Sequence, residues 1–183
     1  MLERYIKGKK KYLIGFHAQE HRGAKYLSIP IKCKASNAWL GVGYYFWVDV
    51  KYAKFWGEDF KVKNTGFYDV YKSYIDDERF INASFSEEGY FFFKNKIENA
   101  IEFLKEKGMT VSLEKVHRFL ADQVWPKLDV TGIIYDDLPH NVPRKSRIYS
   151  EVEPLYYQKR IQIVVFDEAN LNTFVPYLKN KTK

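Results

Sequence analysis

Residues 36–49, Ser-Asn-Ala-Trp-Leu-Gly-Val-Gly-Tyr-Tyr-Phe-Trp-Val-Asp, form the densest aromatic run of the chain, and Gly41 and Gly43 interrupt it. The bulky residues from Tyr44 to Val48 are typical of a buried β-strand. The two glycines allow a positive φ or a close approach to the backbone. Composition alone indicates a core strand entered through a turn, because aromatic residues pack in cores far more often than they bind ligands.

The segments around this strand predict an α+β fold. Strands are expected at residues 12–17, 67–74, 80–85, 130–135 and 160–166, and helices at 50–60, 90–107 and 113–125. Asp49 and Ser112 are suited to cap two of these helices, Gly108 to end one, and Gly57 to end or weaken the first. Strands and helices do not alternate regularly, which argues against a doubly wound parallel sheet.

Length and composition predict one folded domain over residues 1–183, with a basic arm at 1–11 and a basic tail at 175–183. With 46% hydrophobic residues the chain can bury a core without disulfides. The single cysteine, Cys33, is interpreted as a small filler residue of a reducing compartment, so a cytoplasmic location is expected. No apolar run reaches the length of about 18 residues that a membrane span needs.

The formal net charge of +7 favours an anionic partner, although a basic surface also increases solubility. The expected loop before the last strand carries a basic cluster, Arg144, Lys145 and Arg147, followed by Arg160. Tyrosines are interleaved with these residues, a combination that suits phosphate neutralisation and base stacking on nucleic acid. A solvated loop, or one that binds an acidic protein, remains the alternative.

Three short motifs follow one another on predicted strands: Phe16-His17-Ala18, the run from Trp39 to Phe46, and Ile161-Gln162-Ile163-Val164. Together they resemble the ADP-ribosyltransferase superfamily, in the branch with a histidine, a tyrosine and a late Glu or Gln. This branch includes the poly(ADP-ribose) polymerases and bacterial toxins. A bacterial form of the second motif is matched at Trp39, Leu40, Gly41, Gly43, Tyr45, Phe46, Ala53 and Trp56. The resemblance implies a split β-sandwich with flanking helices and a cleft for NAD.

The resemblance also implies roles for individual residues. His17 would bond the adenosine ribose of NAD, and the backbone of Ala18 would meet the nicotinamide amide. Tyr45 would stack on the nicotinamide ring, with Gly43 and Trp56 also in contact with NAD. A purely structural histidine is the alternative for His17. Strand alternation places Tyr44 and Phe46 in the core and Tyr45 on the opposite face.

This chain departs from the family pattern where Ala18 replaces glycine, Gln19 replaces Thr or Ser, and Gln162 replaces glutamate. Gln162 would be the third catalytic residue, and an amide can bond a ribose but cannot act as a general base. A polar residue satisfied within the sheet is the alternative. Arg160, two residues earlier, would join the loop cluster in binding the acceptor. The base could be any of several carboxylates or the acceptor itself; the carboxylates are Asp136, Asp137, Glu151 and Glu153.

Other chemistries receive less support from the sequence. The four histidines lack metal-ligand spacing, since His17 and His21 would need a helix to share one face. No Gly-x-Ser-x-Gly nucleophile elbow is present. We therefore expect NAD as a substrate and no metal.

The function expected from the resemblance is that of a mono-ADP-ribosyltransferase of the bacterial toxin type, in a toxin–antitoxin or antiphage system. It would transfer ADP-ribose to a macromolecule, with nucleic acid, and RNA in particular, as the favoured acceptor, and a cognate antitoxin is implied. The alternatives are a transferase that targets proteins, an NAD glycohydrolase, and an inactive module that binds NAD or nucleic acid.

Overall fold

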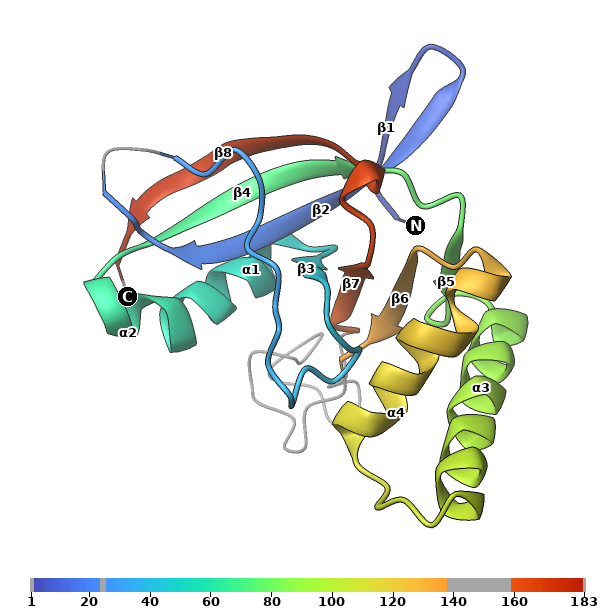
Figure 1. Ribbon diagram of the computed structural model, residues 1–183. Helices are drawn as coiled ribbons and strands as arrows, with labels where there is room; N and C mark the ends of the chain where they lie inside the picture. Colours follow the sequence, from blue (N-terminus) through green and yellow to red (C-terminus); the bar gives the residue numbers. More distant parts are fainter. Residues whose placement is uncertain (1, 24–25, 138–158, 183) are drawn as a thin grey trace, which may run out of the picture.

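The computed structural model describes residues 2–23, 26–137 and 159–182 (Figure 1). The strands are β1 (Arg4–Lys7), β2 (Lys10–Glu20), β3 (Tyr44–Trp47), β4 (Tyr68–Ile75), β5 (Phe80–Asn82), β6 (Gly132–Asp136), β7 (Ile161–Val165) and β8 (Leu171–Lys181). The main helices are α1 (Val50–Trp56), α2 (Val62–Thr65), α3 (Glu87–Glu106) and α4 (Leu113–Phe119). Short π and 3₁₀ turns are η1 (Gly57–Lys61), η2 (Leu120–Val124), η3 (Pro126–Leu128) and η5 (Glu168–Asn170).

The strands form one mixed sheet of eight, mostly antiparallel, in the order β5-β6-β7-β3-β2-β4-β8, with β1 paired to β2. The sheet is weakest between β2 and β3, which share the single pair Phe16–Trp47. By contrast, β2 pairs with β4 along Leu13–Glu20, and β3 pairs with β7 along its whole length. The sheet therefore consists of a first half, β1-β2-β4-β8, and a second half, β3-β7-β6-β5. The expected α+β class is confirmed.

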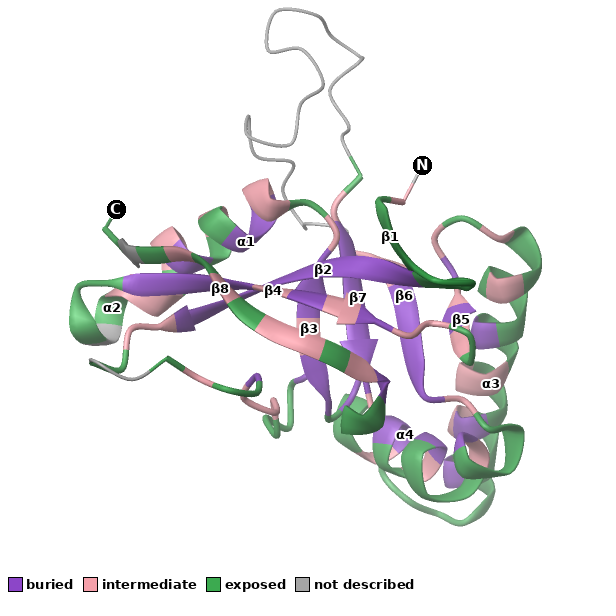
Figure 2. Ribbon diagram, turned by 90° about the horizontal axis from the view of Figure 1, so that it is seen from above, coloured by how far each residue is buried: buried purple, intermediate pink, exposed green. Residues whose placement is uncertain are grey.

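Each half-sheet has its own helical cover (Figure 1). Tyr52 and Ala53 of α1 pack against Phe16 and other apolar residues of the first half. Helices α3 and α4 pack against the second half, where Phe93 contributes to the same apolar cluster as Val164. In Figure 2 the strands of the second half are largely buried, whereas the outer surfaces of α3 and α4 are exposed. A further cluster of Leu13, Ile75, Phe46 and Ile163, among others, joins the two halves.

The alternation expected along β3 is confirmed. Tyr44 and Phe46 belong to the cluster that joins the two halves. Tyr45 packs against the cluster under α3 and α4, and Trp47 against the cluster under α1. One short strand thus contributes side chains to all three apolar clusters, which explains its aromatic density.

The expected helix caps are also confirmed, and α1 ends directly before Gly57 as expected. Asp49 accepts a hydrogen bond from the Lys51 backbone N–H at 2.8 Å, and Ser112 accepts one from Lys115. Gly57 is the C-cap of α1, but the chain does not reverse there: it continues through η1 and α2 to Gly66, where φ is +77°. Gly57 has helical φ and ψ, and a Cβ there would lie 2.2 Å from the Tyr68 ring. This glycine allows a close approach to β4 and not a chain reversal.

The basic arm and the basic tail expected at the ends of the chain are corrected. Residues 4–7 form β1, which pairs with β2, and residues 171–181 form β8, which pairs with β4. Backbone pairing overrides the lysine-rich composition, because edge strands tolerate lysine on their solvent side. The strand expected at 80–85 covers only Phe80–Asn82. Among the residues that the structure describes, no helix combines the length and the apolar character that a membrane crossing requires.

Candidate functional site

His17 lies on β2 beside the junction of the two half-sheets and is 7% exposed. Its Nδ1 is 2.8 Å from the backbone carbonyl oxygen of Tyr45. A carbonyl only accepts, so Nδ1 carries the proton of this hydrogen bond. Burial lowers the pKa of His17 below the ordinary histidine value, despite the bond to Tyr45. The neutral ring therefore keeps Nε2 as a hydrogen-bond acceptor.

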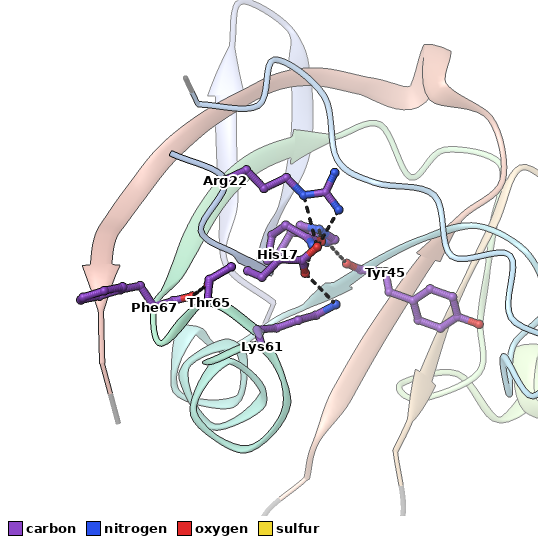
Figure 3. A network of polar contacts seen from close by, with 8 residues as sticks. His17, Arg22, Tyr45, Lys61, Thr65 and Phe67 are labelled. Atoms are coloured by element: carbon purple, nitrogen blue, oxygen red, sulfur yellow. Dashed lines mark hydrogen bonds and ion pairs between the residues drawn. The ribbon is translucent and has the colours of Figure 1, made fainter. Parts of the chain in front are cut away.

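A polar network surrounds the open nitrogen of His17 (Figure 3). Nε2 lies 3.4 Å from Oε1 of the buried Gln19. In this tautomer both atoms are hydrogen-bond acceptors, and the distance is long, so they form no strong hydrogen bond. Gln19 donates to Glu20, whose carboxylate is held by Arg22 at 2.6 Å and by Lys61 at 3.8 Å. Burial alone would raise the pKa of Glu20, but the hydrogen bonds from Arg22 and its own backbone, together with the charge of Lys61, leave it lowered. The carboxylate stays ionised at neutral pH.

Tyr45 touches His17 through its backbone, and its ring points away from the imidazole (Figure 3). The Tyr45 hydroxyl donates to the Gly41 carbonyl at 2.7 Å and accepts from the Leu40 N–H at 3.1 Å. Burial raises the pKa of Tyr45 above the ordinary tyrosine value. The hydroxyl is therefore committed to the turn that precedes β3, and only the half-buried ring is left to meet a ligand.

The two glycines before β3 allow close packing against other parts of the protein. Gly41 has φ of +89°, and a Cβ there would lie 3.3 Å from the His117 ring. A Cβ on Gly43 would lie 2.5 Å from Val164 Cγ2 and 2.8 Å from the Val165 carbonyl oxygen. The close approach that the sequence indicated at Gly43 is therefore to β7. The predicted contact of Gly43 with NAD stays a prediction.

Gln162 shares a face of the second half-sheet with Tyr45. The register pairs Tyr45 with Val164 and Trp47 with Gln162, so Tyr45 and Gln162 are diagonal neighbours on one face. Gln162 is 7% exposed, and its Oε1 accepts a hydrogen bond from the Trp39 indole Nε1 at 2.8 Å. The structure thus places Tyr45 and Gln162 on one face of the sheet.

The His17 side chain points to the other face, because its neighbour Phe16 is the β2 partner of Trp47. There it packs against Phe46 and Phe174.

Arg160 lies beside Trp47 in a mixed cation–aromatic cluster. Its guanidinium carbon is 5.4 Å from the Trp47 ring centroid and 5.6 Å from that of Tyr52. It also donates to Asp137 Oδ2 at 2.7 Å. Burial raises the pKa of Asp137 above the ordinary value, and the charge of Arg160 only partly offsets this effect. Asp137 is therefore a stronger base than a surface aspartate.

Trp56 at the end of α1 adds an exposed aromatic surface to the same region. Its ring centroid is 6.4 Å from that of Trp47, and it stacks on Phe60 at 4.1 Å. Trp56 and Phe60 are both exposed, and Lys63 lies over the Phe60 ring. Ala18 is buried under α1, so only its backbone could meet a ligand.

Several predicted residues lie outside the described part of the chain. These are the acceptor-binding Arg144, Lys145 and Arg147 and the candidate bases Glu151 and Glu153. Sequence reasoning missed other residues beside the site, namely Glu20, Lys61 and Phe60. Two of them carry a signal that could have been used: Glu20 is a charged residue two positions after the His17 motif, and Phe60 lies four residues after Trp56. The sequence held no signal for Lys61.

Among residues 2–23, 26–137 and 159–182, no group of three His, Cys, Asp or Glu side chains could hold a metal ion. A cavity of about 520 Å³ lies apart from His17, between the 32–42 segment and α4. Its lining includes His117 and Trp125.

Comparison of this chain with protein-family models, with curated protein sequences and with solved structures finds no match.

Proposed function

We propose that this protein is an NAD-dependent mono-ADP-ribosyltransferase with a split β-sandwich fold. The observation that carries the proposal is the hydrogen bond from the His17 side chain to the backbone of Tyr45 at the junction of the two half-sheets, with Gln162 on the strand next to Tyr45. These are the three positions that the resemblance assigns to catalysis. The weak pairing of β2 with β3 supports a ligand site at the place where the sheet divides.

The neutral His17 ring supplies an acceptor, and a ribose hydroxyl of NAD is a donor that fits it. Trp56 and Phe60 offer exposed faces for stacking, and the Tyr45 ring lies beside Gln162. The guanidinium of Arg160 suits the diphosphate or an anionic acceptor.

In the proposed reaction, the bond between C1′ of the ribose and the nicotinamide nitrogen breaks, and nicotinamide leaves with the bonding electrons. An acceptor oxygen or nitrogen then forms a bond to C1′ and loses its proton to a base. Asp137 is the base that we favour among the four candidates, because burial raises its pKa and it lies against Arg160. Gln162 carries no charge, so it bonds the ribose without stabilising the cationic transition state through a charge.

For the acceptor we favour nucleic acid, and RNA in particular. The net charge of +7 and the basic cluster of Arg144, Lys145 and Arg147 support an anionic macromolecule. By its resemblance the protein would act as a toxin-type effector in the bacterial cytoplasm, with an antitoxin as its partner. A protein acceptor is the next choice.

Nicotinamide release from NAD tests the site. We expect His17→Ala and Tyr45→Ala each to lower release by at least tenfold, whereas Lys94→Ala on the exposed side of α3 leaves it unchanged. Full activity in both site variants contradicts the assignment.

Binding of NAD without turnover, measured by calorimetry, identifies an inactive binding module. This is the second candidate function, and the uncharged Gln162 favours it. Release of nicotinamide without a labelled macromolecule identifies an NAD glycohydrolase.

A further inference from the structure

The amide of Gln162 has a fixed orientation. The indole nitrogen of Trp39 is a donor only, so the amide atom 2.8 Å from it must be the oxygen, Oε1. The Nε2 group of Gln162 is then the part of the amide left for other partners. No residue in the described part of the chain accepts a hydrogen bond from it.

The Trp39 indole is itself held firmly. Its ring edge packs on Tyr135 with the ring centroids 5.5 Å apart, and Tyr135 pairs with Gln162 across β6 and β7. The Trp39 carbonyl oxygen accepts from Nε2 of His117, a buried residue of α4, at 2.8 Å. Such anchoring removes the rotational freedom that would let the indole release the amide.

The next residues tie the same turn to β3. Leu40 is 1% exposed, and its N–H donates to the Tyr45 hydroxyl, which donates to Gly41. The turn that carries Trp39 is therefore fixed by β3, β6 and α4 together. One consequence is that Tyr45 and Gln162 are connected through Trp39 as well as through the sheet.

We propose that Trp39 is a positioning residue for Gln162, which fixes the amide so that its N–H₂ group, and not its oxygen, is presented to the substrate. This inference rests on the proposed function. Gln162 then donates to an oxygen of the NAD ribose. Arg160, two residues earlier and directly before β7, also presents N–H donors. Together they make the start of β7 selective for an oxygen-rich ligand that accepts hydrogen bonds.

Trp39→Phe tests this role, because it keeps a ring against Tyr135 and removes the N–H. Trp125→Phe is the matched control: it removes an indole from the same apolar cluster and leaves the Trp39–Gln162 hydrogen bond in place. The first readout is the ¹⁵N–¹H spectrum of the full chain, with the Gln162 side-chain amide pair assigned by its loss in Gln162→Ala. We expect Trp39→Phe to shift this pair and Trp125→Phe to leave it in place.

The second readout is kinetic. We expect Trp39→Phe to lower kcat for nicotinamide release roughly tenfold to a hundredfold with little change in KM for NAD, since a misplaced group acts mainly in the transition state. Unshifted Gln162 amide signals in Trp39→Phe, or kcat equal to that of the unmodified protein, overturn the positioning role. If the unmodified protein turns over no NAD, the proposed function fails, while a shift of the amide pair in Trp39→Phe still supports the hold of Trp39 on Gln162.

Discussion

Nδ1 of His17 donates a hydrogen bond to the backbone carbonyl oxygen of Tyr45 at 2.8 Å. The bond crosses from β2 to β3, where the two half-sheets share only the pair Phe16–Trp47 within the described residues. It fixes the tautomer of a buried imidazole and so leaves Nε2 as an acceptor. A backbone carbonyl cannot be removed by a side-chain substitution, so this arrangement depends on the fold of β3 and on His17 alone.

The protonation state of His17 makes NAD binding sensitive to acid in a defined way. Protonation would convert Nε2 from an acceptor into a donor, and burial lowers the pKa of His17 below the ordinary value of about 6.5. Affinity for NAD should therefore stay constant as the pH falls through 6.5 and weaken only at lower pH. Calorimetric titrations between pH 8 and pH 5 measure this; an affinity that halves at or above pH 6.5 contradicts it.

Asp137 should control the acidic limb of the pH–rate profile. A base must be ionised, so activity falls as the pH drops through its pKa, which burial raises above the ordinary aspartate value. Asp137→Asn should lower kcat by roughly 10²- to 10⁴-fold and remove this limb. Asp129→Asn is the matched control, because Asp129 is an exposed aspartate paired with Arg79. An unchanged acidic limb in Asp137→Asn would exclude Asp137 as the base.

Gly57→Ala should destabilise the protein although it introduces a better helix former. Alanine in place of glycine within a helix contributes about 1 kcal/mol, but the new Cβ would lie 2.2 Å from the Tyr68 ring. Overpacking of this kind costs about 1–3 kcal/mol or more, so a lower urea midpoint is expected. Lys54→Ala, on the exposed side of α1, should leave the midpoint nearly unchanged. A Gly57→Ala protein more stable than the parent would show that Tyr68 moves freely.

The basic cluster of Arg144, Lys145 and Arg147 should bind phosphate groups of RNA. For a single strand, each phosphate that is no longer neutralised reduces the slope of log K against log salt by about 0.7, so the triple alanine variant should flatten it by about 2. The control is the alanine triple at Lys94, Lys96 and Lys105, which removes equal charge from α3. Equal salt dependence in the two triples would assign RNA binding to another surface, and NAD binding should be unaffected in both.

The sequence was most informative where the alternation of side chains along a strand, or the capping residue of a helix, decides local structure. Alternation along Tyr44–Trp47 correctly placed Tyr44 and Phe46 in the core, and Asp49 and Ser112 cap helices as expected. These features depend on neighbours within a few residues of the chain. Local reasoning also placed the end of α1 at Gly57, but it did not reveal that Tyr68, 11 positions away, leaves no room for a Cβ there.

Long-range pairing explains what the sequence did not reveal. Residues 175–181 look like a solvated basic tail, yet they lie in β8 because β4 supplies backbone partners along this stretch, with irregularities in the register. At the candidate site, the sequence indicated His17, Tyr45 and Gln162, but not that the Tyr45 hydroxyl is committed to its own turn. Nor did it indicate the bond from Trp39 to Gln162, which spans 123 residues.

The most direct test of the central claim is transfer of label from NAD. NAD labelled in the adenosine-side phosphate is incubated with the full chain and with separate pools of RNA, DNA and protein, and the same is done with His17→Ala. We predict label covalently attached to RNA, with stoichiometric release of nicotinamide, and loss of both in His17→Ala. No release of nicotinamide with any pool would contradict the account.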